Sequence, residues 1–283
     1  MIELQPSEFQ ALIPALRRVP INKLFARSVL EQRVVGTVWV DRCDNPSLIH
    51  VIHPYGMTLL FGDASGTRPT ALKAHMLALG LNRGDKWLQA SPEALFPLLD
   101  DLLDVELATA DQQPGGPIVQ RYTRSNFQFN LTRYALKRRL ISPDEESILR
   151  PLLATDFALP DIEVSPHKFW TSADQFLAHG GGWCLERNGQ LASMAFSSFR
   201  FDHQLEIGVE TRANFRGRHY AFYAACALID QCISQGLEPV WSCRKENKGS
   251  YKLALALGFE PTVEIPYYRL PGSGAARMLH LLC

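Results

Sequence analysis

The sequence predicts an α/β (α+β) protein with two domains that repeat one order of secondary structure. A chain of 283 residues, of which 46% are hydrophobic, can bury a sizeable core, and its length allows two domains. Helical and strand-like hydrophobic patterns alternate along the chain. Both halves have the order αα-βββ-α-β-α-β, so we expect residues 1–138 and 139–283 to form two domains of similar fold.

The elements of the first half follow from periodicity and from capping residues. Ser7 is expected to cap the first helix, Gly80 to end the third, and Ser91–Pro92 to precede the fourth. The predicted elements are helices 8–18 and 21–32, strands 33–41, 47–53 and 57–62, helix 71–79, strand 86–90, a helix after residue 92 and strand 116–130. A basic segment, residues 131–141, is expected to connect the two halves.

The second half contains two capping boxes and a hairpin turn. Ser142, followed by Pro143 and Glu145, and the pair Ser172 and Gln175 each predict a helix start, and Asn188–Gly189 predicts a tight turn. The predicted elements are helices 144–153 and 173–179, strands 183–187, 190–201 and 204–210, helix 218–235, strand 239–243, helix 250–257 and strand 262–270.

Charge and hydropathy limit the partners of the protein. Its 29 basic and 29 acidic residues balance, which argues against nucleic acid because neutralising phosphates needs a surplus of Lys and Arg. The first 19 residues lack the charged and apolar regions of a signal peptide, and no run of about 18 apolar residues occurs. We therefore expect a cytoplasmic protein with a small-molecule partner and no nucleic-acid or membrane partner. The sequence leaves its oligomeric state open.

The cysteines and histidines do not predict a metal site. The six cysteines form no CxxC pair, and four lie in apolar helix or strand patterns, so buried free thiols are expected. His50 and His53 flank a strand end without an acidic or cysteine partner at ligand spacing.

Residues 209–225, VETRANFRGRHYAFYAA, join a basic turn to an amphipathic helix. Gly217 lies between Arg216 and Arg218 at the junction. A helix N-terminus has about four unpaired N–H groups and roughly half a unit of positive charge, so a flexible turn at this point forms a cradle for an anion. The alternative is an ordinary basic helix start.

The residues around this cradle resemble those of a known family. The stretch IGVETRANFRGRHYA, followed by a helix, VWSC, ENKGSYKLALALGF and a closing aromatic strand, resembles the GNAT (GCN5-related) acetyltransferases. WTSADQFLAHGGGWCLERNGQLAS with PVWSCRKENKGSYKLALALGF is most similar to the zwittermicin A resistance-type branch. The resemblance covers residues 165–270, and the first half only loosely. It implies a C-terminal GNAT fold with a mixed, mostly antiparallel sheet, a GNAT-like degenerate N-terminal domain, and acetyl-CoA as co-substrate.

In the resembled family the pyrophosphate signature is [Q/R]-x-x-G-x-[G/A], and residues 216–221 have the sequence Arg-Gly-Arg-His-Tyr-Ala. Arg216 and Ala221 match, whereas His219 occupies the position of the second glycine. A histidine there either points outward, where it can assist a phosphate, or weakens the site. The resemblance implies that the co-substrate is bound by Ile207, Val209, Arg216, Gly217, Arg218, His219, Tyr220, Ala221, Asn247 and Ser250.

Residues 204–210, QLEIGVE, alternate so that Glu206 and Glu210 share the polar face of a strand. Acyl transfer needs a deprotonated amine, and in the resembled enzymes a carboxylate near this strand often removes the proton. Both glutamates are candidates. We favour Glu206, because Glu210 would lie close to the phosphates. The alternative is that both are solvated.

The expected acid is less well defined. The resembled enzymes often place a tyrosine seven residues after the motif asparagine to protonate the leaving thiolate, but this chain has Ala254 at that distance from Asn247. Tyr251, one helical turn earlier, is the candidate acid, with Tyr267 or Tyr268 as the alternative.

The resemblance implies an acetyl-CoA-dependent N-acetyltransferase acting on a primary amine of a small molecule, such as an aminated antibiotic or metabolite. In the first half, residues 62–75 lack the signature, so we expect an N-terminal domain that binds no CoA and walls the substrate cleft. One alternative is a CoA-binding or sensory module without turnover, which His219 and Ala254 favour. Another is an acyltransferase that uses a different acyl-CoA, or a protein or aminoacyl acceptor.

Overall fold

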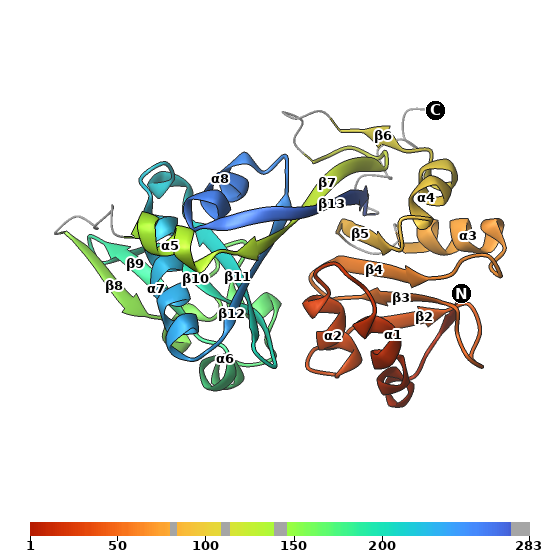
Figure 1. The fold of residues 1–283 in the computed structure, drawn as a ribbon, viewed down its shortest axis with the longest axis horizontal. Coiled ribbons are helices and arrows are strands. Elements are labelled where there is room, and N and C mark those ends of the chain that lie inside the picture. Colours follow the sequence, from red (N-terminus) through yellow and green to blue (C-terminus); the bar gives the residue numbers. More distant parts are fainter. Residues whose placement is uncertain (80–83, 109–113, 139–145, 273–283) are drawn as a thin grey trace. The chain divides into compact units, whose positions relative to one another are not determined.

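The computed structural model describes residues 1–79, 84–108, 114–138 and 146–272, and the chain forms two compact units (Figure 1). The first unit contains residues 1–125, 244–246 and the chain from 263 onward, and the second contains 126–243 and 247–262. The chain therefore passes between the units inside strands β7 (Gln120–Phe129), β12 (Glu238–Arg244) and β13 (Phe259–Leu270), and again at the start of α8. These divisions differ from the expected boundary between residues 138 and 139.

The first unit contains a sheet with the strand order β1-β2-β3-β4-β5-β13. Its elements are β1 (Ile2–Glu3), the 3-10 helix η1 (Pro6–Leu12), α1 (Ile13–Arg17), α2 (Leu24–Leu30), β2 (Thr37–Val40), β3 (Leu48–Ile52), β4 (Met57–Gly62), α3 (Pro69–Leu79), β5 (Lys86–Ser91), α4 (Leu95–Leu103) and β6 (Glu106–Leu107). Neighbouring strands are antiparallel except for β4 and β5, which are parallel. Strand β6 pairs with β7 in parallel.

The apolar residues of helices α3 and α4 form the core of this unit with the sheet. Leu72, Met76 and Leu79 recur at helical spacing on α3, and together with Leu95 and Leu99 of α4 they are buried against the sheet. Burying each such side chain contributes roughly 1.5–3 kcal/mol. The alternation of β3 and β4 places Leu48 and its neighbours under these helices.

The second unit contains a sheet in which β12-β11-β10-β9-β8 are neighbours. Its elements are α5 (Leu131–Arg138), β8 (Ser147–Pro151), the 3-10 helices η2 (Ala154–Asp156) and η3 (Pro166–Lys168), α6 (Ala173–His179), β9 (Gly182–Arg187), β10 (Gln190–Phe201), β11 (Gln204–Thr211), the 3-10 helix η4 (Ala213–Phe215), α7 (Tyr220–Ser234), β12 (Glu238–Arg244) and α8 (Lys248–Ala256). The described strand pairs are antiparallel except for β11 and β12. The expected mixed, mostly antiparallel sheet is confirmed.

Helix α7 covers one face of this sheet. Ala225, Leu228, Ile229 and Cys232 form its apolar stripe and are buried in one core with Leu205, Ile207 and Trp241 of β11 and β12. In Figure 1 the helix crosses strands β9–β11. This packing fixes the direction in which the N-terminus of α7 points.

Two local predictions are wrong. Residues 147–151 of the expected helix 144–153 form edge strand β8, because pairing with β9 and the ion pairs of Arg150 to Asp156 and Glu186 stabilise an extended chain. The helix expected over 8–18 is divided into η1 and α1, with Gln5 rather than Ser7 at its start. Pro14 explains the division, because it has no N–H to continue one helix.

The remaining elements agree with the predicted types, with boundaries shifted by a few residues. Ser172 caps α6 by accepting a hydrogen bond from the N–H of Gln175 at 3.2 Å. Asn188 and Gly189 have φ of 51° and 71°, as a tight hairpin turn requires. The expected basic connector forms α5 over residues 131–138. Gly80 and the box of Ser142, Pro143 and Glu145 lie outside the described residues.

Candidate functional site

The turn before α7 has the backbone geometry of an anion cradle. Gly217 has φ of 78°, and His219, the N-cap of α7, has φ of 62° in the left-handed region. Within the described chain, the N–H groups of residues 217–221 donate to no protein acceptor. Successive free N–H groups around left-handed residues form a concave donor surface that attracts anions. The histidine therefore has the backbone conformation for which a glycine would be the usual choice.

Side chains leave this cradle open to solvent. A Cβ atom built on Gly217 would meet no atom within 4 Å. Arg216, Arg218 and His219 are exposed, whereas Tyr220 is buried against Phe215. The packed tyrosine anchors the first turn of α7, and Ala221 is half-buried behind it. Positive side chains thus surround the donor surface without covering it.

Glu210 lies beside the cradle. Its Oε1 accepts hydrogen bonds from Nη2 of Arg216 at 3.3 Å and from the N–H of Thr211 at 3.1 Å. The Nε of Arg216 also donates to the carbonyl of Thr211 at 3.1 Å. Glu210 therefore orients an arginine of the cradle, which agrees with the expectation that it lies nearer the cradle than Glu206 does.

Strands β11 and β12 pair over only part of their length. Their parallel register runs from Gln204↔Glu238 to Glu206↔Val240, although β11 continues to Thr211 and β12 to Arg244. Ile207 and Val209 belong to the part of β11 beyond this register. The end of pairing leaves backbone groups on the facing edges of the two strands that an extended ligand can use.

Glu206 lies at the last paired position of β11. The residue is 6% exposed, so the alternative interpretation of Glu206 as a solvated residue is wrong. Oε1 of Glu206 accepts a hydrogen bond from Oγ of Ser242 at 3.2 Å. Alternation along β11 places Glu206 on the face opposite to Leu205 and Ile207, which face α7.

The start of α8 holds three further candidates. Asn247 is the N-cap, and its Oδ1 accepts a hydrogen bond from the N–H of Ser250 at 3.1 Å. This contact gives Asn247 a local structural role. Tyr251 packs edge-on against Phe127 with the rings 5.3 Å apart, next to the core that Leu205 and Ile207 line. The structure therefore places Tyr251 and Glu206 on opposite faces of the sheet.

The alternative acids Tyr267 and Tyr268 belong to the first unit. Tyr268 is fully buried there, and its hydroxyl donates to Oδ1 of Asp100 at 2.9 Å. Tyr267 stacks on Trp87 with the rings 5.1 Å apart. Both tyrosines are parts of the packed interior of that unit, so neither is kept as an acid.

Residues 62–75 of the first unit correspond in position to the cradle, and this segment contains a carboxylate. Asp63, after β4, accepts hydrogen bonds from the N–H and the hydroxyl of Ser65, both at 2.8 Å, and these bonds lower the pKa of Asp63. A carboxylate in the segment that precedes α3 disfavours a bound phosphate.

The described residues contain no group of three or more His, Cys, Asp or Glu side chains that could hold a metal ion. His50 lies 2.8 Å from His75 between Nδ1 and Nε2, and burial lowers the pKa of His75 to about 4. Burial also lowers the pKa of His53 to about 3. Cys184, Cys226, Cys232 and Cys243 are buried free thiols, Cys43 is exposed, and Cys283 lies outside the described residues.

Among the described residues, no helix combines the length and apolar character needed to cross a membrane.

The sheet is mixed, the parallel strands β11 and β12 pair over only part of their length, and a turn rich in N–H donors precedes α7. Together these features are typical of a GNAT-type acetyltransferase. The family model described as GNAT acetyltransferase matches residues 20–268, so the chain belongs to this family and is a GNAT-family N-acetyltransferase. An uncharacterized N-acetyltransferase of Bacillus subtilis (strain 168), YdfB, is 24% identical over 254 residues, which are 86% of this chain and 89% of the relative.

Solved structures support the same fold. A GCN5-related N-acetyltransferase-like protein from Streptococcus suis matches with a TM-score of 0.66 and 21% identity, over 93% of this chain and 99% of that one. A tandem GNAT protein from the clavulanic acid biosynthesis pathway matches with a TM-score of 0.60 and 12% identity, over 95% and 97% of the two chains.

The sequence interpretation missed Ser242 and Arg244 as functional candidates. Ser242 contacts Glu206, and Arg244 lies over two aromatic rings of the first unit. The sequence VWSCR does alternate, with Trp241 and Cys243 buried. That alternation indicates that Ser242 and Arg244 share the other face of β12.

Proposed function

We propose that this protein transfers the acetyl group of acetyl-CoA to a primary amine of a small molecule. The observation that supports the donor most directly is the row of free N–H groups over residues 217–221, next to exposed Arg216 and Arg218. A pyrophosphate needs many donors and positive charge, and this turn offers both. The open space at Gly217 lets a phosphate approach the backbone.

Other residues would hold the rest of the co-substrate. The edge of β11 that carries Ile207 and Val209 has backbone groups beyond its pairing with β12, which suits an extended amide-containing arm. Asn247 and Ser250 remain candidates through their exposed or half-buried positions at the start of α8. When bound, acetyl-CoA supplies an activated thioester carbonyl carbon.

Glu206 is the residue that we assign to proton removal. In the transfer, the amine nitrogen forms a bond to the acetyl carbon, the carbon–sulfur bond breaks, and the nitrogen loses a proton. A carboxylate held by a hydroxyl, as Glu206 is held by Ser242, can accept that proton directly or through water. The sulfur leaves with the bonding electrons, and a thiol with a pKa of about 8.5 needs little help near neutral pH. An enzyme without a dedicated acid is therefore feasible, and Tyr251 is not required.

A module that binds CoA without turnover is the second candidate. The substitution of glycine by His219 and the alanine at 254, buried in the core, favour it. The left-handed backbone of His219 weighs against it, because the turn keeps the conformation that a glycine would adopt. Other acyl donors, and protein or aminoacyl acceptors, are compatible with the same cradle.

The specific branch of the family is also a proposal. We place the chain with the zwittermicin A resistance-type acetyltransferases on the motifs of residues 165–270, which would make an aminated antibiotic or metabolite the acceptor. We further propose that residues 1–138 and 139–283 derive from two GNAT-like domains, of which the first binds no CoA. The Asp63 carboxylate in the segment before α3 and the similarity in fold to a tandem GNAT protein support this organisation.

The experiment is acetyl transfer to a panel of primary amines, measured as released free thiol and as an acetyl mass increase of the amine. We expect turnover with acetyl-CoA and the loss of turnover in Gly217→Pro. Binding of acetyl-CoA without transfer to any amine would favour the silent module. Faster transfer from a longer acyl-CoA would replace the proposed donor.

A further inference from the structure

Strand β10 of the second unit contains a bulge beside Glu206. Its register with β11 pairs Ser197 with Ile207 and then Phe199 with Glu206. Ser198, between these two pairs, is an extra residue without a partner on β11. Bulges redirect side chains and are over-represented next to active sites. This bulge places Ser198 next to the residue that lies directly opposite Glu206.

The hydroxyl of Ser198 lies in the space that a side chain at position 208 would fill. A Cβ atom built on Gly208 would lie 2.5 Å from Oγ of Ser198 and 2.7 Å from Cζ of Phe196. Gly208 and Glu206 are two residues apart on β11, so their side-chain positions share one face of the strand. A glycine inside a strand often marks such a close approach. The hydroxyl of Ser198 therefore lies over β11 on the face that carries Glu206.

Neighbouring contacts hold the bulge in place. The carbonyl of Ser197 accepts a hydrogen bond from Nε1 of Trp170 at 2.7 Å. The ring of Phe199 packs edge-on against that of Phe169, with the ring centroids 5.4 Å apart. The residues on both sides of Ser198 are thus fixed, which sets the direction of its side chain.

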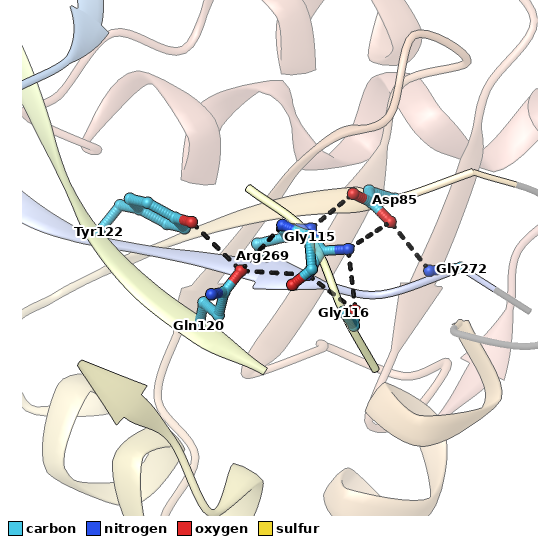
Figure 2. Close-up of polar contacts among 7 residues, drawn as sticks. All are labelled: Asp85, Gly115, Gly116, Gln120, Tyr122, Arg269 and Gly272. Atoms are coloured by element: carbon cyan, nitrogen blue, oxygen red, sulfur yellow. Dashed lines mark hydrogen bonds and ion pairs between the residues drawn. The ribbon is translucent and has the colours of Figure 1, made fainter. Parts of the chain in front are cut away.

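The hydroxyl of Ser198 is available to a ligand. Ser198 is 5% exposed and makes no hydrogen bond with a described residue. Arg269 of the first unit shows the usual arrangement: it is 3% exposed, and all three guanidinium nitrogens donate to Asp85, Gln120 or backbone carbonyls (Figure 2). Buried polar groups are nearly always paired in this way, and an unpaired one indicates strain, a bound water or ion, or a catalytic role.

Ser198 lies beside the part of β11 that we assign to the co-substrate. Ile207 and Val209, on either side of Gly208, lie beyond the pairing with β12. The cradle follows the C-terminal end of β11, whereas Glu206 is at the last paired position. A co-substrate that extends from the cradle to Glu206 along this edge passes Gly208, where the Ser198 hydroxyl lies. All of these residues belong to the second unit.

We propose that Ser198 is a further catalytic residue, whose hydroxyl donates a hydrogen bond to the carbonyl oxygen of the thioester. The inference rests on the proposed function, which it deepens by naming a donor that stabilises negative charge. As the amine nitrogen bonds to the carbonyl carbon, an electron pair moves onto the oxygen, and it returns when the carbon–sulfur bond breaks. The proton lost by nitrogen goes to Glu206, and Ser198 keeps its own proton. A fixed donor at this oxygen stabilises the charged state more than the bound thioester.

The first readout is the carbonyl stretching frequency of acetyl-CoA, isotope-labelled at the carbonyl carbon and bound to the full chain. A hydrogen bond to the carbonyl oxygen weakens the C=O bond, so we expect a lower frequency on the wild type than on Ser198→Ala. Ser197→Ala is the matched control, because it removes the neighbouring hydroxyl of the same bulge, which shares the opposite face of the sheet with Ile207. This control should keep the wild-type frequency.

Turnover on a confirmed amine gives the second readout. Ser198→Ala should lower kcat about 10²- to 10³-fold, as removal of one donor to a developing oxyanion does, while KM for acetyl-CoA changes little. The shape of the pH profile should be retained, because Glu206 remains the base. Thermal unfolding of Ser198→Ala should occur at the wild-type temperature or above, since the variant loses a buried hydroxyl without a protein partner among the described residues. Ser197→Ala should keep the wild-type kcat.

Three results would overturn this assignment. The first is an equal carbonyl frequency on the wild type and on Ser198→Ala, and the second is a wild-type kcat in that variant. The third is an equal frequency change in Ser197→Ala, which would attribute the effect to the bulge as a whole. The frequency needs no acceptor, so it decides the inference even before an amine is identified. Failure of acetyl-CoA to bind the wild type would contradict the proposed function itself, whereas binding without a change in frequency contradicts this inference alone.

Discussion

Oγ of Ser242 on β12 donates a hydrogen bond to Oε1 of Glu206 on β11 at 3.2 Å, at the position where the pairing of the two strands ends. The contact joins two residues that are separated in sequence by α7. It holds a buried carboxylate beside the unpaired edges of the strands. In the proposed mechanism Glu206 is the base, and the hydrogen bond from Ser242 fixes its orientation.

Glu206→Gln should lower turnover about 10²- to 10⁴-fold on a confirmed amine, because a positioned base contributes that much. Acetyl-CoA affinity should change little, and the residual rate should recover as pH rises and free amine becomes abundant. Rates and binding are measured from pH 6 to 9. The control is Ser242→Ala, which keeps the carboxylate and should lose less activity. Wild-type activity in Glu206→Gln would mean that catalysis rests on proximity alone.

One acetyl-CoA should bind per chain at saturation. Residues 62–75 of the first unit lack the signature of residues 216–221, and Asp63 already places a carboxylate in this segment, where it accepts two hydrogen bonds from Ser65. Calorimetric titration of the full chain gives the stoichiometry directly. Two molecules per chain would show that the first unit also binds the co-substrate.

Replacing His219 by glycine should keep or strengthen acetyl-CoA binding. His219 has φ of 62°, which costs an ordinary residue roughly 1–2 kcal/mol and a glycine almost nothing. His219→Ala retains the strain but removes the imidazole, so the pair separates the two effects. Weaker binding in both variants would show that the imidazole contacts the phosphates and that a backbone-only cradle is insufficient.

The buried histidines of the first unit should make the protein less stable in acid. Burial lowers the pKa of His53 to about 3 and of His75 to about 4, whereas the unfolded value is near 6.5. Between these values the unfolded state binds more protons, so stability falls as pH decreases through this window, by about 1.4 kcal/mol per pH unit for each histidine. Above pH 7 this contribution is constant.

Urea unfolding at pH 7.5, 6 and 5 measures this dependence. His53→Asn is the matched variant, because an amide oxygen can replace Nδ1 as acceptor for the N–H of Tyr55 without titrating. The slope of its unfolding free energy against pH should be smaller, by the equivalent of up to one proton bound on unfolding. An unchanged slope in this variant would mean that His53 titrates normally in the folded protein.

The sequence predicts the strands and helices whose signals are local. The alternation of residues 190–201 and 204–210 and the Asn188–Gly189 turn predict β10, β11 and their hairpins almost to the residue. Strand β8 could not be predicted, because its pairing with β9 and the ion pairs of Arg150 are contacts between separate segments. The passage of the chain between units inside β7, β12 and β13 is also non-local.

The same distinction applies to the site. The signature over residues 216–221 predicts the cradle, and its backbone geometry agrees even where His219 replaces glycine. Alternation places Glu206 on a strand face, but cannot show that Ser242 contacts it. Arg244 lies over rings from β5 and β7, and no spacing in the sequence predicts contacts between such separate strands.

The central claim is that the backbone of the turn before α7 binds the co-substrate, and acetyl-CoA affinity of Gly217→Pro tests it most directly. Proline removes the N–H of residue 217 and requires φ near −65°, whereas Gly217 has φ of 78°. Gly217→Ala, the control, keeps the N–H and meets no neighbouring atom, although it adds strain. With both variants folded by circular dichroism, we predict that acetyl-CoA binding is abolished in Gly217→Pro and largely kept in Gly217→Ala. An unchanged dissociation constant in Gly217→Pro would contradict the assignment of the cradle.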